Sequence, residues 1–420
     1  MMISKSGFFR ISTLAFIILV TPVLGVYLHS PGGVLVILSL SILVGLFENS
    51  FTPALRGISN TVVKNKLLIY FLLWYSICLI INLFMEGNGL DDWRLIISPV
   101  ILFIAILFAF AFMSDDICRR YLQIGLILAL GMQSILAIPQ LYLNPSIARQ
   151  MWTDLSGSWI YGSQTYFATC AILLPVLFWR SFKENGILKL LLLVCCLLIL
   201  ISVSISSFAT PLGLTLMNII VTLALALMFM IKKKGLIVAI MLSLILYFGY
   251  QYTFRNPLLS DANTRIMNFI NDPTSGGYSG RDLAGSRWYL GDLSIESFKA
   301  SPLFGMGGGS TRYSSFVGGH SSLLDNLGAY GIFGGGGAFA ILILILLRNA
   351  FYRFLHERTW QALLSLSTVI SLMVAGIINP YWEGTPTLFV ILIARPFIDH
   401  IRKTKPDYQK SGCSISPSQP

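Results

Sequence analysis

Apolar stretches of about 16–24 residues recur along the chain and limit its fold more than any other feature. A helix of about 20 residues is long enough to cross the hydrocarbon core of a bilayer. Charged residues make up only 11% of the chain, against about 25% in ordinary soluble domains. A soluble protein of this size could not cover its surface with so few charges. The sequence therefore predicts an all-α, polytopic integral membrane protein.

The hydropathy pattern predicts about twelve transmembrane helices. They cover residues 11–28, 33–47, 67–84, 95–113, 121–141, 163–179, 187–205, 208–231, 235–253, 326–347, 361–379 and 384–401. An alternative for the stretch from 187 to 231 is one re-entrant feature followed by one span. The predicted organisation is spans one to nine in residues 1–253, one large outer (periplasmic) loop in 254–325, spans ten to twelve in 326–402, and a cytoplasmic tail in 403–420.

The distribution of basic residues predicts the orientation in the membrane. With a cytoplasmic N-terminus, 20 of the 29 Lys and Arg residues fall on the cytoplasmic side, eight fall outside, and Arg395 lies within the last span. The cytoplasmic set is Lys5, Arg10, Arg56, Lys64, Lys66, Arg119, Arg120, Arg180, Lys183, Lys189, Lys232, Lys233, Lys234, Arg348, Arg353, Arg358, Arg402, Lys403, Lys405 and Lys410. This bias follows the positive-inside rule. We therefore expect both termini in the cytoplasm and no nucleic-acid partner, despite the net charge of +11.

The basic residues on the outer side are almost all arginines. They are Arg94, Arg149, Arg255, Arg265, Arg281, Arg287, Arg312 and Lys299. The guanidinium fork of arginine binds phosphate or carboxylate through two parallel hydrogen bonds. These arginines are therefore candidates for binding an anionic substrate. The alternative is local ion pairing with acidic residues of the same loop, which are Asp261, Asp272, Asp282, Asp292 and Glu296.

The large outer loop carries a predicted helix near 286–299, which Ser301–Pro302 should end. Gly305, Gly307, Gly308 and Gly309 follow, and glycines at this density allow backbone N–H groups to approach an anion. The segment lacks the Lys-Ser/Thr pair of a phosphate-binding P-loop.

His320 lies just before the next predicted helix. Ser322 and Asp325 have the spacing of a capping box, so a purely structural role for them is the main alternative to a catalytic one. The positive end of the helix dipole favours a neutral imidazole, which accepts a proton. The chain has four histidines, and only this one falls in a polar segment with neighbouring arginines and glycines. His320 is therefore the candidate general base.

An ordered set of residues in this region resembles the O-antigen polymerase and O-antigen ligase family. The set comprises Arg287-Trp288, Phe298, Ser301-Pro302-Leu303-Phe304-Gly305, Gly307, Gly319-His320-Ser321, Leu323, Tyr330-Gly331 and Gly334. The resemblance implies a multi-pass glycosyltransferase of the bacterial inner membrane that uses undecaprenyl-diphosphate-linked sugars. It also implies that Arg287 engages the lipid diphosphate and that His320 is the base. The remaining substrate-binding candidates are Arg265, Arg281, Arg312, Gly305, Gly307, Gly319, Ser321 and Tyr330.

The implied reaction is metal-independent, inverting glycosyl transfer. Arginines would stabilise the departing diphosphate, and His320 would deprotonate the acceptor hydroxyl. No metal site and no cofactor are predicted. Asp292, Glu296 and Asp325 are alternative bases or orienting groups for the histidine. The implied partners are the lipid-linked oligosaccharide, membrane lipid, a chain-length regulator and a flippase.

Several alternatives remain at this point. Ligases of this family usually carry an arginine in a Ser-Arg context at the start of the span after the seventh. The stretch Ser204–Pro211 has none, which favours a polymerase over a ligase that transfers polymer to lipid A-core. A lipid-linked oligosaccharide transporter is disfavoured because the spans hold almost no ionisable residues. Polyprenyl-phosphate-sugar transferases usually carry paired acids in the first outer loop, whereas Asp91-Asp92 lies one outer loop later.

Overall fold

The computed structural model describes Trp74, Val390 and residues 116–143, 164–206, 209–229, 283–306, 321–333 and 335–379. All regular structure in these segments is helical. The helices are α7 (Asp116–Leu143), α9 (Gln164–Lys183), α10 (Gly186–Ile205), α11 (Ala209–Phe229), α14 (Leu283–Ala300), α15 (Ser322–Tyr330), α16 (Gly335–Glu357) and α17 (Trp360–Ile378). Four segments are long and apolar enough to cross a membrane: Gln123–Leu143, Gly186–Ile205, Thr210–Met228 and Trp360–Ile378. The chain is thus a helical, multi-pass membrane protein.

These four segments coincide with the predicted spans at 121–141, 187–205, 208–231 and 361–379. Within the stretch from 187 to 231, the helices α10 and α11 are each long and apolar enough to cross a membrane, which favours two spans over the re-entrant alternative. The predicted span at 163–179 is the helix α9, which has polar residues at its start and Arg180 and Lys183 in its last turn. The predicted spans at 11–28, 33–47, 67–84, 95–113, 235–253 and 384–401 lie outside the described residues, apart from Trp74 and Val390, which are both helical.

The predicted single helix at 326–347 is wrong, because the chain breaks there into α15 and α16. Gly331 ends α15 with a φ of +67°, a conformation that side-chain-bearing residues rarely adopt. The following N–H groups of Ile332 and Phe333 donate to Pro302 O and Leu303 O, both at 2.9 Å. The break therefore arises from pairing with the turn that follows α14, which apolar periodicity could not reveal.

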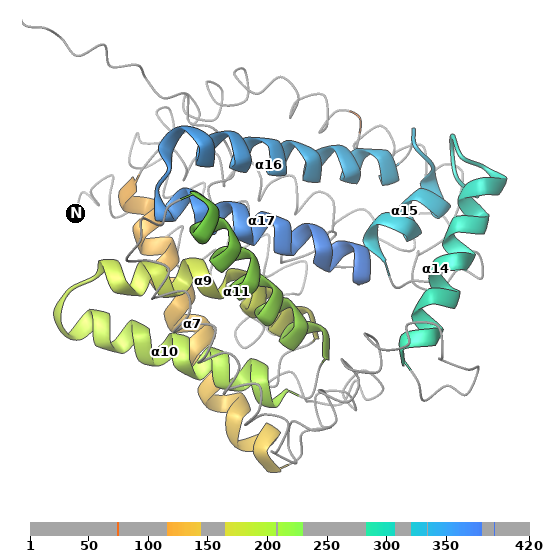
Figure 1. Cartoon of the computed structure of the whole chain (residues 1–420). Coiled ribbons are helices and arrows are strands. Elements are labelled where there is room, and N and C mark those ends of the chain that lie inside the picture. Colours follow the sequence, from red (N-terminus) through yellow and green to blue (C-terminus); the bar gives the residue numbers. More distant parts are fainter. Residues whose placement is uncertain are drawn as a thin grey trace, which may run out of the picture.

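The helices of the membrane part pack around α9 and α17. Figure 1 shows α9 and α10 as one antiparallel pair and α16 and α17 as another, with α11 crossing between them. Small residues bring the backbones close together. A Cβ added to Gly131 on α7 would lie 2.6 Å from Cys195 Cβ on α10. Such close approach is the usual basis of helix association in membranes.

A few polar side chains connect three of these helices inside the apolar core. Asn218 on α11 donates from Nδ2 to Ile172 O on α9 at 2.8 Å. Ser367 on α17 donates to Asn218 Oδ1 at 2.5 Å and accepts from Thr222 Oγ1 at 2.8 Å. Interhelical hydrogen bonds of this kind contribute about 0.6–2 kcal/mol each in a membrane.

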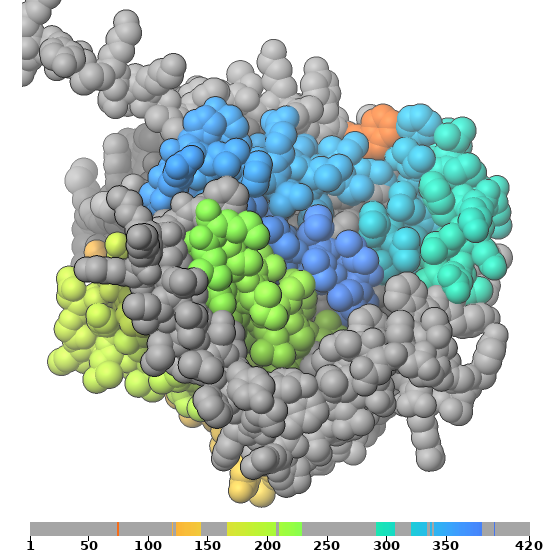
Figure 2. All heavy atoms as spheres, in the orientation of Figure 1, coloured from red at the N-terminus to blue at the C-terminus, as the bar shows by residue number. Residues whose placement is uncertain are grey.

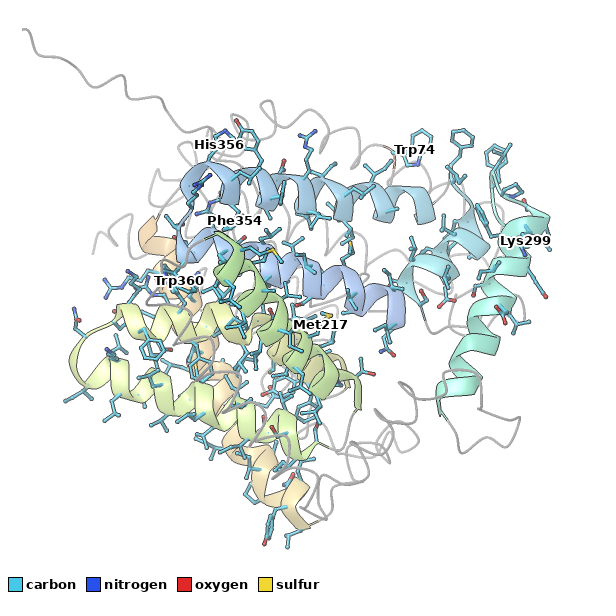
Figure 3. All side chains as sticks on the ribbon, viewed as in Figure 1. Trp74, Met217, Lys299, Phe354, His356 and Trp360 are labelled. Carbon is cyan, nitrogen blue, oxygen red and sulfur yellow. The ribbon has the colours of Figure 1, made fainter. Side chains whose placement is uncertain are left out.

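Charged residues gather at one end of the bundle. Arg120 on α7 and Arg180 on α9 both donate to the buried carboxylate of Glu184, which lies in the α9–α10 turn. The α16–α17 turn lies toward the same side in Figure 1. In Figure 3, His356 and Trp360 lie toward that side, whereas Lys299 and Trp74 lie toward the other. We call these two ends the basic end and the outer end.

Candidate functional site

Helices α14 and α15 pack together at the outer end, and they carry the motif that the sequence analysis singled out. Contacts occur in the same order along both segments. A Cβ on Gly291 would lie 3.5 Å from Leu324 Cδ1, and Ser294 Oγ donates to Asp325 Oδ1 at 2.6 Å. Further along, Gly305 lies against Ala329. The two segments therefore run in the same general direction, with their N-terminal ends at one side of the junction.

The carboxylate of Asp325 joins the two helices. Its second oxygen, Oδ2, accepts from the backbone N–H of Ser321 at 2.8 Å, and only 3% of Asp325 is exposed. Ser321 Oγ in turn accepts from Leu324 N at 3.2 Å, so Ser321 is the N-cap of α15. This reciprocal capping fixes the backbone at Ser321, the residue directly after His320.

The cap differs by one residue from the predicted one. Ser321, rather than Ser322, caps α15, and Asp325 reaches back four residues instead of three. The Ser322 hydroxyl donates instead to Asn379 O at 3.4 Å, beyond the end of α17. Asp325 holds two donors in a buried position, and this geometry favours an anchoring role over that of an alternative base.

The glycine-rich turn after α14 packs closely against the C-terminal end of α15. Gly305 has a φ of +74°, and an added Cβ would come within 2.2 Å of Ala329 O and 2.3 Å of Tyr330 N. The Gly305 N–H donates to Ser301 O at 2.9 Å and the Met306 N–H to Gly328 O at 3.1 Å. These two N–H groups are therefore occupied by the fold. The predicted binding of an anion by this turn depends on Gly307 and the residues after it, which lie outside the described part.

The backbone position of Arg287 lies on the same helical face of α14 as two residues that contact α15. The backbone at Arg287 is helical, and Gly291 and Ser294 follow at four and seven residues, which places all three on one helical face. The contacts of Gly291 and Ser294 show that this face meets α15. With a rise of 1.5 Å per residue, Arg287 lies about 10 Å before Ser294 along the helix axis. The position of Arg287 is thus at the N-terminal end of the pair, the end at which Ser321 caps α15.

The other predicted site residues divide into two groups. The structure describes Gly305, Ser321 and Tyr330. Gly305 packs against Tyr330 at the C-terminal end of α15, whereas Ser321 caps the N-terminal end of the same helix. The side chain of Arg287 lies outside the described part, as do the residues His320, Arg265, Arg281, Arg312, Gly307 and Gly319. Their roles in binding and catalysis stay predictions. Within the described segments, His, Cys, Asp and Glu side chains form no group of three that could hold a metal ion.

The sequence analysis missed three contacts that position the site. Asn379 donates from Nδ2 to Thr210 Oγ1 at 3.1 Å, which joins the outer ends of α17 and α11 next to the start of α15. Asn326 donates to Ser322 O at 2.7 Å within α15. Ser294 was also missed, although its spacing of seven from Arg287 could have revealed a common face. Asn379 directly follows an apolar stretch, and a polar residue at such a position could also have indicated a contact at the end of the span.

No protein-family model matches this chain. A comparison with curated proteins also finds no match. The resemblance to O-antigen polymerases and ligases therefore rests on the motif residues alone.

Aromatic side chains gather beside the turn that follows α14. The ring centroid of Phe333 lies 6.1 Å from that of Phe304 and 6.0 Å from that of Trp74. All three side chains are exposed, with Phe304 at 71%. Figure 3 shows Trp74 near the start of α16, on the side of α14. An exposed tryptophan such as Trp74 is typical of the boundary between lipid and water.

Proposed function

We propose that this protein is a polysaccharide polymerase of the bacterial inner membrane, which joins undecaprenyl-diphosphate-linked repeat units. The product would be an O-antigen or capsule polymer. The observation that carries this proposal is the packing of α14 on α15. It brings the helix position of Arg287 and the capped residue after His320 to the N-terminal ends of one helix pair. The proposal assigns to this junction both residues that the family motif implies as catalytic.

In the proposed reaction an acceptor hydroxyl attacks the anomeric carbon of the donor sugar. His320 takes the hydroxyl proton while the new bond from carbon to oxygen forms. The bond from that carbon to the diphosphate oxygen breaks, and undecaprenyl diphosphate leaves with the electron pair. Arg287, together with Arg265, Arg281 and Arg312, stabilises the negative charge that develops on the diphosphate. Attack opposite the leaving group inverts the configuration at the anomeric carbon.

The helix junction gives Asp325 a positioning role in this reaction. Its carboxylate fixes Ser321 N, and Ser294 from α14 fixes the carboxylate. A base that abstracts a proton must stay within hydrogen-bond distance of it, so the backbone before it must be held in place. The packing of α15 on α14 would thus hold His320 at a fixed position relative to Arg287.

The separation of the two ends supports the proposed orientation in the membrane. The Arg120–Glu184–Arg180 cluster and the α16–α17 turn with Arg358 lie at the basic end, and the α14–α15 junction lies at the outer end. Because positive charge is retained in the cytoplasm, we assign the basic end to the cytoplasm and the outer end to the periplasm. With the twelve spans that the hydropathy pattern predicts, both termini would then be cytoplasmic.

Ligation is the second candidate within this family. The outer end of α11 begins beside α15, and Thr210 there contacts Asn379. By the resemblance, the arginine that ligases usually carry would lie at this end of α11. The chain has no arginine from Ser204 to Pro211. Because this stretch lies near the junction, the absence of an arginine there favours a polymerase over a ligase.

The direct test uses purified protein with lipid-linked repeat units and excess chelator. A polymerase forms a ladder of longer products on the lipid carrier, with inversion at each new linkage. Products that appear only when lipid A-core is added would identify a ligase instead. Movement of lipid-linked units across a liposome membrane without elongation would identify a transporter. Loss of polymer formation on addition of chelator would show that a metal ion supplies the charge assigned here to arginine.

A further inference from the structure

An apolar crevice lies among α11, α16 and α17, away from the α14–α15 junction. It has a volume of about 380 Å³, within the range of about 300–1,000 Å³ that is common for small-molecule sites. Six apolar side chains and one arginine line it. They are Leu225 on α11, Leu344, Leu347, Arg348 and Phe351 on α16, and Leu366 and Ile370 on α17. In Figure 2, α11 and α16 lie on the visible face with α17 between them.

Arg348 is unusual in this setting because no described residue provides a counter-charge for it. Among the described residues it has neither an ion pair nor a hydrogen bond, and its side chain is exposed. By contrast, Arg353 on the same helix is buried and donates from Nε to Glu357 Oε1 at 2.7 Å. Glu357 is the single acidic residue in the sequences of α11, α16 and α17. These three helices therefore leave the charge of Arg348 uncompensated.

The hydropathy pattern places Arg348 at the cytoplasmic end of a span, whereas in the structure it shares a crevice with residues of a membrane-spanning segment, where its charge is costly. It lies nine residues before Glu357, which is about 14 Å from the end of α16. Leu366 and Ile370, which share the crevice, belong to the membrane-spanning segment Trp360–Ile378. A charged side chain within the hydrocarbon region costs about 2.5–3.5 kcal/mol on insertion scales unless it extends to the interface or meets an anion. An anion that itself belongs to the lipid would satisfy Arg348.

We propose that this crevice binds an anionic glycerophospholipid from the leaflet at the basic end. One acyl chain occupies the apolar wall between Leu344 and Ile370, and the phosphate accepts hydrogen bonds from the Arg348 guanidinium. The apolar lining matches the chain, and the unpaired arginine matches the phosphate. A guanidinium donates to phosphate in a bidentate manner, which gives this contact both charge and geometric specificity. The site is independent of the proposed polymerase reaction.

The test is native mass spectrometry of the purified, delipidated protein in detergent micelles. The probes are phosphatidylglycerol and phosphatidylcholine with identical acyl chains, added in equal amounts. Wild-type protein should retain one phosphatidylglycerol in preference to phosphatidylcholine. Arg348→Ala should weaken this retention about tenfold, the loss expected from one pair of charge-assisted hydrogen bonds. Arg348→Lys should retain an intermediate preference, because the charge stays and the fork is lost.

Two further variants separate the crevice from general surface charge. Lys183→Ala removes an exposed cation at the end of α9, at the same end of the bundle, and should leave retention unchanged. Leu344→Trp adds bulk to a crevice residue that is 59% exposed. It should lower retention of both lipids at an unchanged unfolding temperature, because the side chain is not part of the core.

Equal retention of the two lipids by wild-type protein, unchanged retention by Arg348→Ala, or an equal loss in Lys183→Ala would each overturn the proposal. A lipid-free dimer that Leu344→Trp dissociates would also overturn it, since the crevice would then hold a second copy of the chain.

Discussion

The α14–α15 junction and the core of membrane helices are held together by different physical means. In the core, helices meet through many apolar side chains and a few hydrogen bonds, such as that from Ser367 to Asn218. At the junction, backbone lies directly on backbone at Gly305, and a single buried carboxylate joins two helices. Apolar packing tolerates exchange between side chains of similar volume. Backbone contact at positive φ and a paired carboxylate do not, so the junction should be far more sensitive to substitution than the core.

The largest expected effect concerns the two ends of the molecule. Lys299 is exposed on α14 at the outer end, and Asn185 is exposed in the α9–α10 turn at the basic end. In a variant without the six native cysteines, Lys299→Cys should react with a membrane-impermeant thiol reagent in intact spheroplasts. Asn185→Cys should react only after the membrane is opened. The opposite pattern would place the junction in the cytoplasm and end the proposed polymerase function.

The difference between these regions also explains how much could be predicted from the sequence. Membrane spans depend on summed hydropathy, so α10, α11 and α17 were predicted almost to the residue. The helix predicted at 286–299 is confirmed as α14, and Ser301–Pro302 ends it as expected. The break at Gly331 could not be predicted, because it depends on hydrogen bonds to Pro302 and Leu303 from a distant turn.

The same reasoning applies to the candidate site. The sequence predicted that Gly305, Ser321 and Tyr330 belong to one site; in the structure Gly305 packs against Tyr330, whereas Ser321 lies at the opposite end of α15. The roles of Ser294 and Asn379 depend on which residues lie opposite them in the fold. A spacing pattern within one helix cannot show such partners.

The next effect in size is on the chemical step. His320→Ala should lower the rate of polymer formation about 10²–10⁴-fold, the usual loss when a general base is removed. Arg287→Lys keeps the charge and loses the fork, so it should also be severely impaired. Both rates would be measured with purified protein at equal amounts in the membrane. Full activity of His320→Ala would exclude it from the mechanism and direct attention to Asp292 and Glu296.

Gly305→Ala should be the most destabilising of the small substitutions at the junction. The positive φ costs about 1–2 kcal/mol for a residue with a Cβ, and overlap with Ala329 adds about 1–3 kcal/mol. Gly213→Ala on α11 is the matched control, because an added Cβ there meets nothing within 4 Å. It should be neutral or stabilising by about 0.5–1 kcal/mol. Thermal unfolding in detergent checks both variants, and an equal response would contradict the comparison of regions.

Ser294→Ala should have a moderate effect that appears more in activity than in abundance. It removes one donor to the buried carboxylate of Asp325, and hydrogen bonds to charged groups contribute about 1.5–3 kcal/mol. The control is Ser365→Ala on α17, which deletes a buried hydroxyl that has no hydrogen-bond partner. The control should keep full activity and stability. If Ser294→Ala also keeps full activity, Asp325 positions the base without help from α14.

The smallest effect is expected from exchanging apolar side chains in the core. Leu363 on α17 is fully buried and lies in the main apolar cluster. Leu363→Met preserves volume and should cost less than about 1.5 kcal/mol, because an unbranched thioether chain adapts to the space around it. Polymer yield should be unchanged, and the unfolding midpoint should fall by less than that of Gly305→Ala. A loss as large as that of Gly305→Ala would show that α17 transmits its packing to the junction through Asn379, which directly follows it. The core would then share the sensitivity that we assign to the junction alone.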